Sequence, residues 1–300
     1  MKKLTALIEL ARPGHWIKNL LVFAAILFSG RYVELDMWWR AILAFASFCL
    51  LASGAYAWND VFDRKADAAN PNLRRRPIPS GRVAVAEAAV TGTILLAGGI
   101  LLAMPLGDRA VAVAVAYLLL NALYNGLLRH RPIADVVSIA MGFVLRAIAG
   151  GVAVQVEVSV WLIVCTFMLC VFLALIKRRA EIAALGQEAA ESARPVQAFY
   201  TLVRLDHMLA VSAGLAVVMY TCYCVVGKHA HGVHMVWTVP IVLYGMFRLY
   251  SLAVGPRPAG PVELIRRDKA MWVVALVWLA AVVAIMRTKD LPQLSGWIKP

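Results

Sequence analysis

Residues Ala57–Val83 read AWNDVFDRKADAANPNLRRRPIPSGRV, and this is the most polar stretch of an otherwise apolar chain. It follows directly on an apolar run of about 20 residues, the length that a helix needs to cross the hydrocarbon core of a membrane. The stretch therefore begins at the end of a predicted membrane-spanning helix. It brings three aspartates and then three arginines to that helix end.

The composition points to a membrane protein throughout. The chain has 300 residues, of which 62% are hydrophobic, and its mean hydropathy is +0.75, whereas soluble domains are about half apolar. Backbone polar groups in lipid must be satisfied within the segment, which favours helices, and the alternating pattern of a membrane barrel is absent. We predict an all-α integral membrane protein with a single polytopic domain over residues 1–300.

Nine apolar segments are predicted to span the membrane: 16–36, 38–58, 84–104, 110–128, 132–154, 158–176, 207–227, 233–250 and 270–286. With the N-terminus in the cytoplasm and the C-terminus outside, 22 of the 30 Lys and Arg residues fall on the inner side. Basic residues accumulate on the cytoplasmic side of membrane proteins. The net charge of +13 is thus a sign of topology, and no nucleic acid partner is needed to explain it.

The long polar loops all lie on the predicted cytoplasmic side, after the second, sixth and eighth spans. Because function concentrates in such loops, we expect an active site that faces the cytoplasm, in a multi-pass protein of the cell (inner) membrane. The first ten residues mix charged and apolar side chains, and we expect an amphipathic segment at the membrane surface.

The three aspartates have the spacing of a metal site. Asp60, Asp63 and Asp67 are spaced i, i+3, i+7, so a continuing helix places them on one face, and Asn59 adds an amide oxygen. Clustered carboxylates repel one another unless a cation lies among them, and oxygen ligands suit Mg²⁺ shared with substrate phosphates. The alternative is a solvated charge cluster that ends the span.

Several cations on the same side are candidates for phosphate binding. Guanidinium groups match phosphate geometry, but Arg74–Arg76 could also be ordinary topogenic charge or contacts to anionic lipid. Tyr124 precedes Arg129 at the next inner loop. Lys177–Arg179 close the sixth span with Glu181 beyond them, where the helix dipole would by itself favour cations.

Two further polar sites lie inside predicted spans. Arg146 is deep in GFVLRAIAGG, where a charge is costly and is a functional candidate by default, although an internal ion pair is the alternative. Lys18 and Asn19 come early in the first span, and Lys18 could instead extend its ammonium group to the interface.

The spacing of these residues resembles the UbiA superfamily of membrane prenyltransferases. Asn59-Asp60-x-x-Asp63-x-x-x-Asp67 is similar to the first Asp-rich motif of that superfamily, and the resemblance extends over nearly the whole chain. It includes the opening Arg12-Pro13-x-x-Trp16-x-Lys18-Asn19, the segment Arg76–Gly81 and the Gly142-Phe143-x-x-Arg146 stretch. The resemblance implies a UbiA-like helical bundle and a transferase activity.

One departure from the superfamily pattern indicates the branch. Members that use prenyl diphosphates carry a second Asp-rich motif after the sixth span, where this chain has Lys177-Arg178-Arg179-Ala180-Glu181. Together with WIKN near the start and PVELIRRDKAM near the end, this resembles the decaprenyl-phosphate phosphoribosyltransferase branch. That branch transfers phosphoribose from 5-phosphoribosyl 1-diphosphate to a polyprenyl phosphate, releases diphosphate, and serves the synthesis of cell-wall precursors.

The resemblance implies roles for a larger set of residues. Mg²⁺ would be held on the diphosphate by Asn59, Asp60, Asp63 and Asp67, the three aspartates being the catalytic residues. Substrate-binding roles are implied for Lys18, Asn19, Arg74, Arg75, Arg76, Tyr124, Arg129, Arg146, Lys177, Arg178, Arg179 and Glu181. Whether Lys177–Arg179 would bind the 5-phosphate or the lipid phosphate stays open.

Two other functions stay open at this stage. The first is a UbiA-type enzyme that moves an isoprenoid from a prenyl diphosphate to an aromatic or other acceptor. The second is a transporter or lipid-binding protein without chemistry, although transporters place charge at mid-membrane in broken helices, and here only Arg146 lies deep. Polyprenyl chain length is not readable from the sequence, and a homo-oligomer is left open.

Overall fold

The apolar segments form helices, as expected for backbone that must satisfy its own hydrogen bonds in lipid. The computed structural model describes residues 2–28, 34–69, 73–193, 195–226, 232–257 and 259–287, and none of these residues lies in a β-strand. Eight helices are long and apolar enough to cross a membrane: Leu35–Ala69, Val85–Leu106, Asp108–Gly126, Ala134–Ala153, Val160–Leu185, Leu202–Val226, Val236–Val254 and Lys269–Met286. The predicted class of all-α membrane protein is confirmed.

The first predicted span, residues 16–36, differs from the other eight. It falls on the 3-10 helix η1 (Pro13–Phe23) and the short helix α2 (Ala24–Phe28), and residues 29–33 lie outside the described part of the chain. A 3-10 segment of this length is unusual, because its hydrogen bonds are poorer than those of an α-helix. The count of nine spans and the orientation of the two termini stay predictions.

The chain packs as two compact units. Unit 1 comprises Met1–Gly126 and Gly142–Val158, and unit 2 comprises Leu127–Met141 and Ser159–Pro300. The helix α6 (Ala134–Ala153) contributes residues to both units. The single domain predicted over residues 1–300 stays a prediction, and each unit is described by itself.

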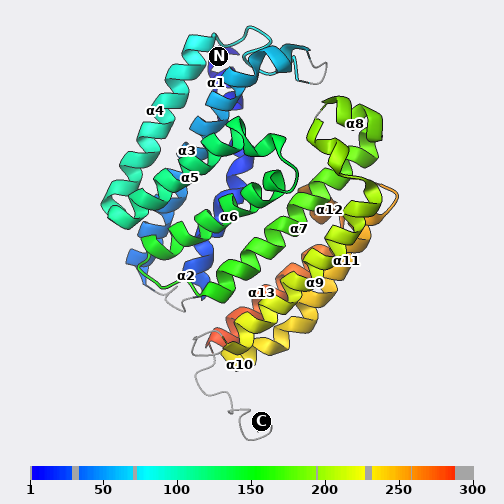
Figure 1. Ribbon diagram of the computed structural model, residues 1–300. Coiled ribbons are helices and arrows are strands. Elements are labelled where there is room, and N and C mark those ends of the chain that lie inside the picture. The colour runs from blue at the N-terminus through cyan, green and yellow to red at the C-terminus, as the bar shows by residue number, and fades with distance from the viewer. Residues whose placement is uncertain are drawn as a thin grey trace, which may run out of the picture. The chain divides into compact units, whose positions relative to one another are not determined.

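Unit 1 is built around one long helix. Its elements are α1 (Lys2–Ala11), η1, α2, α3 (Leu35–Ala69), α4 (Val85–Ala103), η2 (Met104–Leu106), α5 (Asp108–Gly126) and the second half of α6. The helix α4 packs along α3 (Figure 1). The two helices cross closely because Gly99 of α4 has no side chain between them. At this point Ser47 Oγ of α3 donates a hydrogen bond of 2.7 Å to the carbonyl oxygen of Gly99.

The length of α3 positions the acidic residues. Its 35 residues span about 52 Å at about 1.5 Å per residue, whereas the hydrocarbon core is about 30 Å thick. The apolar part occupies its first two thirds, so the helix is long enough for its last turns, which carry Asn59–Asp67, to follow the part that crosses the apolar layer. The predicted continuation of the helix through the three aspartates is confirmed.

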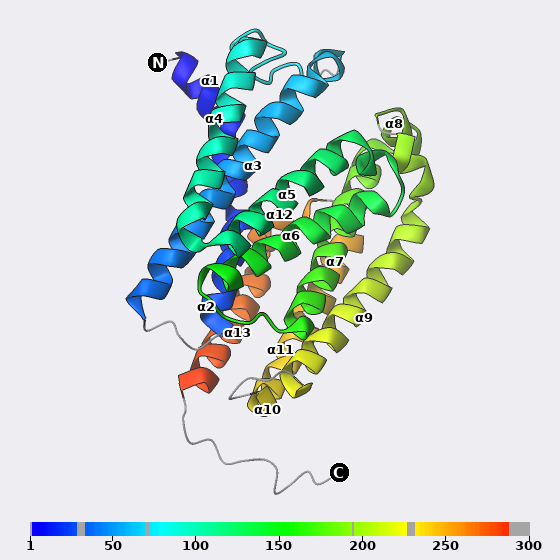
Figure 2. The same ribbon diagram turned by 60° about the vertical axis from the view of Figure 1, so that its left-hand side comes forward.

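The N-terminal helix α1 lies against the same end of unit 1 (Figure 2). Its apolar side chains Ala6 and Leu10 are buried with Ala57 and Val61 of α3. The predicted amphipathic segment is therefore a helix that packs one face on the protein. It brings the next residue, Arg12, to the acidic end of α3.

Unit 2 is a set of helices around its own apolar core. Its elements are η3 (Leu128–His130), the first half of α6, α7 (Val160–Leu185), α8 (Gln187–Ala193), η4 (Pro195–Phe199), α9 (Leu202–Val226), α10 (Gly232–Met235), η5 (Val236–Thr238), α11 (Val239–Val254), α12 (Pro261–Arg267) and α13 (Lys269–Arg287). Its long helices are neighbours in chain order: α7 packs beside α9, α9 beside α11, and α11 beside α13 (Figure 1). Fully buried members of the core include Phe172, Tyr200 and Leu205.

The glycines of α4 give a matched test of the α3–α4 crossing. A Cβ at Gly99 would lie 2.6 Å from Leu51 Cγ and 3.0 Å from the Ser47 carbonyl oxygen, whereas one at Gly98 would meet only Leu50 Cδ1 at 3.4 Å. Overpacking costs about 1–3 kcal/mol, so Gly99→Ala should lower the thermal unfolding midpoint in detergent. The adjacent Gly98→Ala should leave it unchanged or slightly raised, and equal midpoints for the two variants would argue against the close crossing.

Candidate active site

Two of the three aspartates near the C-terminal end of α3 are buried. Asp60 is 1% exposed and Asp67 is 4% exposed, while Asn59 and Asp63 are half-buried. Buried carboxylates require hydrogen-bond donors or cations beside them. In unit 1 these are supplied by two arginines that come from different segments of the chain.

Arg76 connects the two buried carboxylates. Its Nη1 donates to Asp67 Oδ2 at 2.7 Å and to Asp60 Oδ1 at 3.3 Å. The turns that follow it hold its backbone, because Ser80 Oγ and Ser80 N donate to the Arg76 carbonyl oxygen at 2.7 and 3.0 Å. Gly81 closes the loop with a φ of 73°, a conformation that glycine adopts without steric cost. The Pro-Ile-Pro-Ser-Gly sequence after Arg76 thus forms the loop that presents this side chain.

The other two arginines of the run are placed differently from Arg76. Arg74 and Arg75 are exposed, and the carbonyl oxygen of Arg75 accepts a hydrogen bond from Arg82 Nη2 at 2.7 Å. Arg82 also forms an ion pair with Glu9 of α1 at 2.6 Å. The structure therefore brings one of the three predicted arginines to the aspartates.

Arg12 also lies at the acidic cluster, and it was not predicted as a site residue. Its Nη2 donates to Asp60 Oδ1 at 2.5 Å, and its Cζ lies 5.1 Å from the centre of the Tyr56 ring. Its φ of 51° is left-handed, which is uncommon for a residue other than glycine. Two signals in the sequence point to it: it opens the Arg12-Pro13-x-x-Trp16 stretch of the family resemblance, and it stands before Pro13 at the break between two helical segments.

A chain of hydrogen bonds fixes that break against α3. Trp16 Nε1 donates to Ser53 Oγ at 3.0 Å, and Ser53 Oγ donates to the Ala11 carbonyl oxygen at 2.7 Å. Because Ala11 directly precedes Arg12, these bonds hold the Arg12 backbone next to the helix that carries Asp60.

Arg146 is buried in unit 1 at 6% exposure. Its guanidinium donates to Asn19 Oδ1 at 2.6 Å, to the Gly142 carbonyl oxygen at 2.7 Å and to the Tyr117 hydroxyl at 2.8 Å. It also lies over the Tyr117 ring, 4.8 Å from its centre. All these partners are neutral, and Arg146 has no ion pair within the part of the chain that the structure describes, which contradicts the alternative of an internal pair.

Lys18 adds a further positive charge near Arg146. It is half-buried, and the charges of Arg146 and Arg12 both act on it. Tyr56 likewise lies within electrostatic range of both arginines and of Tyr124 of α5. The predicted residues Lys18, Asn19, Tyr124 and Arg146 are therefore grouped in unit 1, in a polar interior with an excess of positive charge. Such an interior favours an anionic ligand.

The acidic cluster has ligands that suit Mg²⁺. Among the described residues no three His, Cys, Asp or Glu side chains converge closely enough to hold an ion by themselves. Mg²⁺ in nucleotide-type sites is bound through one or two carboxylates, with substrate phosphates and waters completing the shell. Asp60 and Asp67 already direct one oxygen each at a shared cation, the Arg76 guanidinium. Two buried carboxylates of this kind fit the metal.

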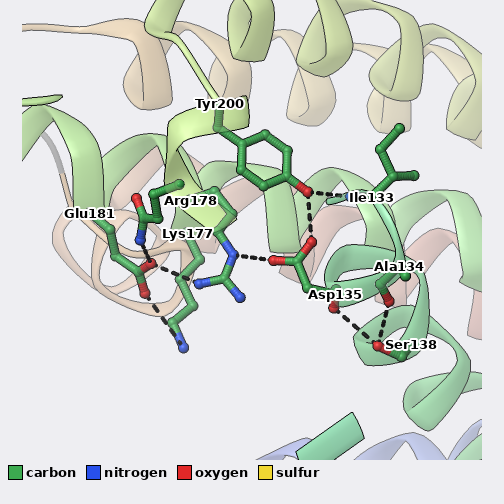
Figure 3. Close-up of polar contacts among 9 residues, drawn as sticks. Ile133, Ala134, Asp135, Ser138, Lys177, Arg178, Glu181 and Tyr200 are labelled. Carbon is green, nitrogen blue, oxygen red and sulfur yellow. Dashed lines mark hydrogen bonds and ion pairs between the residues drawn. The ribbon is translucent and has the colours of Figure 1, made fainter. Parts of the chain in front are cut away.

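A second polar cluster lies in unit 2 around Asp135 (Figure 3). Asp135 is completely buried; its Oδ2 accepts from Arg178 Nε at 2.9 Å, and its Oδ1 accepts from the Tyr200 hydroxyl at 2.6 Å. The same hydroxyl accepts from the Ile133 backbone N–H at 2.8 Å. Burial and the hydrogen bond to Asp135 raise the pKa of Tyr200, so it remains a neutral donor.

Glu181 links this cluster to the surface. Its Oε2 accepts from Arg178 Nη1 at 2.8 Å and from Gln197 Nε2 at 2.9 Å, and its Oε1 lies 3.9 Å from Lys177 Nζ (Figure 3). Lys177 is exposed. The carboxylate therefore holds α7 to the segment around η4 and lies beside the ammonium group of Lys177.

The three consecutive cations of α7 have different surroundings. Arg178 is 1% exposed and is bound inside the Asp135 cluster, whereas Arg179 donates to Asp206 Oδ1 at 2.5 Å and to the Ala253 carbonyl oxygen at 2.9 Å. Lys177 is the exposed member. These cations do not lie at the C-terminus of their helix, because α7 continues to Leu185 and has no basic residue in its last turn.

Arg129 belongs to η3, which lies against η4 in unit 2. It is half-buried, and its Nε donates to His130 Nε2 at 3.1 Å. The loop ends at Ile133, whose φ of 66° is strained for a β-branched residue. Because the Tyr200 hydroxyl holds the Ile133 N–H, the same tyrosine that bonds Asp135 also fixes the loop that carries Arg129.

Known proteins match the chain over most of its length. The UbiA prenyltransferase family model matches residues 20–264. A decaprenyl-phosphate phosphoribosyltransferase of Mycobacterium tuberculosis is 32% identical over 92% of this chain and 93% of its own length. One of Mycolicibacterium smegmatis is 30% identical over 93% of this chain and 92% of its own length.

A solved structure has the same fold. The structure of a UbiA homologue from Archaeoglobus fulgidus bound to DMAPP and Mg²⁺ superposes with a TM-score of 0.71 at 18% identity, covering 93% of this chain and 98% of the other. At this identity the likeness shows the fold alone.

Proposed function

Because the chain belongs to the UbiA prenyltransferase family and is therefore a transferase, we propose that it moves 5-phosphoribose from phosphoribosyl diphosphate to a polyprenyl phosphate. The reaction depends on Mg²⁺ and releases diphosphate. The observation that carries this choice of substrate is that relatives covering over nine tenths of the chain are named decaprenyl-phosphate phosphoribosyltransferases. The basic Lys177–Arg179 segment, which stands where the resemblance implies an acidic motif in prenyl-diphosphate enzymes, supports it.

In the reaction the bond between C1 of the ribose and the diphosphate oxygen breaks, and a lipid phosphate oxygen forms a new bond to C1. Asp60 and Asp67, with Asn59 and Asp63 on the same helix face, would hold Mg²⁺. The metal would supply positive charge to the departing diphosphate. The lipid phosphate is already an anion, so the protein needs no strong general base to activate it.

The cations of unit 1 and unit 2 have distinct proposed roles. In unit 1, Lys18 and Arg146 stabilise an anionic part of the substrate in the polar interior. In unit 2, Lys177 and Arg129 bind phosphate. Arg178 and Arg179 act through their ion pairs with Asp135 and Asp206, which hold this part of α7 in place.

The location follows from the same proposal. The excess of Lys and Arg on the predicted inner side supports a cytoplasmic location for the acidic end of α3. There it would meet soluble phosphoribosyl diphosphate, in the cell membrane that holds the lipid.

A transfer assay with the purified protein tests the proposal. Radiolabelled polyprenyl phosphate is incubated in detergent with Mg²⁺ and phosphoribosyl diphosphate in one tube, and prenyl diphosphate with 4-hydroxybenzoate is supplied in another. We expect a more polar labelled lipid in the first tube, lost on chelation of the metal, and no prenylated aromatic in the second. A prenylated aromatic without phosphoribosyl transfer would place the enzyme in the prenyl-transfer branch.

A further inference from the structure

We infer that Arg76 exchanges partners during the reaction: it is the counter-ion of Asp60 and Asp67 until a divalent cation binds them, and it then binds the diphosphate. The inference rests on the proposed function only where that function invokes a metal and a diphosphate. It would hold for any diphosphate substrate of this site.

The geometry places Arg76 where the metal is expected. One nitrogen, Nη1, contacts an oxygen of each buried carboxylate, at 2.7 Å for Asp67 and 3.3 Å for Asp60. A divalent cation bound by these two oxygens would occupy the place that Arg76 Nη1 now has between them. Two cations would repel each other at that place, so metal binding there would displace the guanidinium.

Arg76 can move, whereas Arg12 is held. The Arg12 side chain is 20% exposed; its guanidinium contacts Asp60 at 2.5 Å and also lies over the Tyr56 ring. The Arg76 side chain is 30% exposed, and its guanidinium contacts only the two carboxylates among the interactions of the described residues. Arg12 therefore stays beside Asp60, and Arg76 is the group that exchanges.

The charges favour a coupled exchange. The two buried carboxylates, Asp60 and Asp67, are paired with two guanidinium groups, those of Arg12 and Arg76. A divalent cation that enters alone would leave an excess of positive charge at a partly buried site, which is unfavourable. A metal that arrives with a diphosphate brings anionic oxygens, and the displaced fork of Arg76 matches phosphate geometry. The metal and the diphosphate should thus each strengthen the binding of the other.

Metal binding without turnover tests this exchange. Free Mn²⁺ is measured by electron paramagnetic resonance, with the detergent-solubilised full chain and with or without inorganic diphosphate. For the wild type we expect weak Mn²⁺ binding that diphosphate strengthens at least about fivefold, within the usual range of coupling between sites. Arg76→Gln should bind Mn²⁺ alone more tightly, by about the same factor, and should lose most of the strengthening by diphosphate.

Two further variants complete the test. Arg82→Gln removes an exposed arginine of the same loop that pairs with Glu9, and it should bind Mn²⁺ like the wild type. Arg76→Lys keeps the charge without the fork, so Mn²⁺ alone should bind as in the wild type while the effect of diphosphate falls. This variant decides the question if Arg76→Gln does not fold.

The outcomes separate this inference from the proposed substrate. Unchanged or weaker Mn²⁺ binding in Arg76→Gln would overturn the exchange, because Arg76 would then serve only to hold the carboxylates in place. Absence of Mn²⁺ binding in the wild type with diphosphate would overturn both the exchange and the metal site. A protein that shows the exchange but does not transfer phosphoribose would retain this inference and lose the proposed function.

Discussion

Asp60→Asn is expected to lower phosphoribosyl transfer by about a hundred- to a thousandfold, the loss typical when a group that stabilises transition-state charge is removed. Asparagine keeps the shape of the side chain and an oxygen that can accept from Arg12 and Arg76. It removes the negative charge that would bind Mg²⁺ beside Asp67. The measurement is the initial rate of labelled lipid formation at saturating Mg²⁺, and Asp63→Asn on the same face should also be strongly impaired.

A matched control lies on the same helix. Asp36 is exposed near the opposite end of α3, so Asp36→Asn makes the same chemical change away from the cluster and should retain the wild-type rate. Size-exclusion chromatography of both variants checks that the fold is kept. Asp60→Asn with near-wild-type turnover would be incompatible with a metal site at this end of α3.

Arg178→Ala is expected to destabilise the protein by about 3–5 kcal/mol, the usual result when one partner of a buried ion pair is removed. Arg178 and Asp135 are both almost completely buried. The variant therefore leaves the Asp135 carboxylate in the interior without its cation, and the Tyr200 hydroxyl remains as its hydrogen-bond donor. The measurement is thermal unfolding in detergent without any substrate, where the midpoint should fall strongly.

The pair of exposed Arg248 and half-buried Asp268 provides the comparison. Its two groups are 2.7 Å apart, but an arginine that is open to solvent contributes little through an ion pair, so Arg248→Ala should leave the midpoint nearly unchanged. If Arg178→Ala instead unfolds like the wild type while phosphoribose transfer is lost, then Arg178 contacts substrate directly, as its position in the sequence first indicated.

The acidic motif could be predicted from sequence because its spacing is local. Residues three and seven apart share a face of any α-helix, so the only assumption was that the helix continues beyond the apolar run, and α3 does continue to Ala69. The loss of apolar character after residue 176 did not mark the end of α7 either, because that helix continues to Leu185.

The surroundings of the cations could not be predicted in the same way. Consecutive helical residues point about 100° apart, so Lys177, Arg178 and Arg179 must face different directions. Which of them is buried depends on Asp135 and Asp206, which lie 43 and 27 residues away in the sequence. A run of three like charges therefore predicts a basic segment, but it does not identify the member that can meet a ligand.

Arg12 shows the same limit at the acidic cluster. It contacts Asp60 across 48 residues of sequence, through a left-handed turn that no composition or periodicity indicates. Its place beside Asp60 comes from packing, because α1 is buried against α3 and Ser53 binds the end of that helix.

A competition assay tests the central claim most directly. The purified wild-type protein is given Mg²⁺, labelled polyprenyl phosphate and 4-hydroxybenzoate together with equal concentrations of phosphoribosyl diphosphate and a prenyl diphosphate, and the products are identified by mass spectrometry. We predict that phosphoribosyl lipid is the only transfer product, and that Asp60→Asn forms almost none of it. Prenylated acceptor as the main product, or phosphoribosyl lipid that forms equally well after the metal is chelated, would contradict the proposed Mg²⁺-dependent phosphoribosyl transfer.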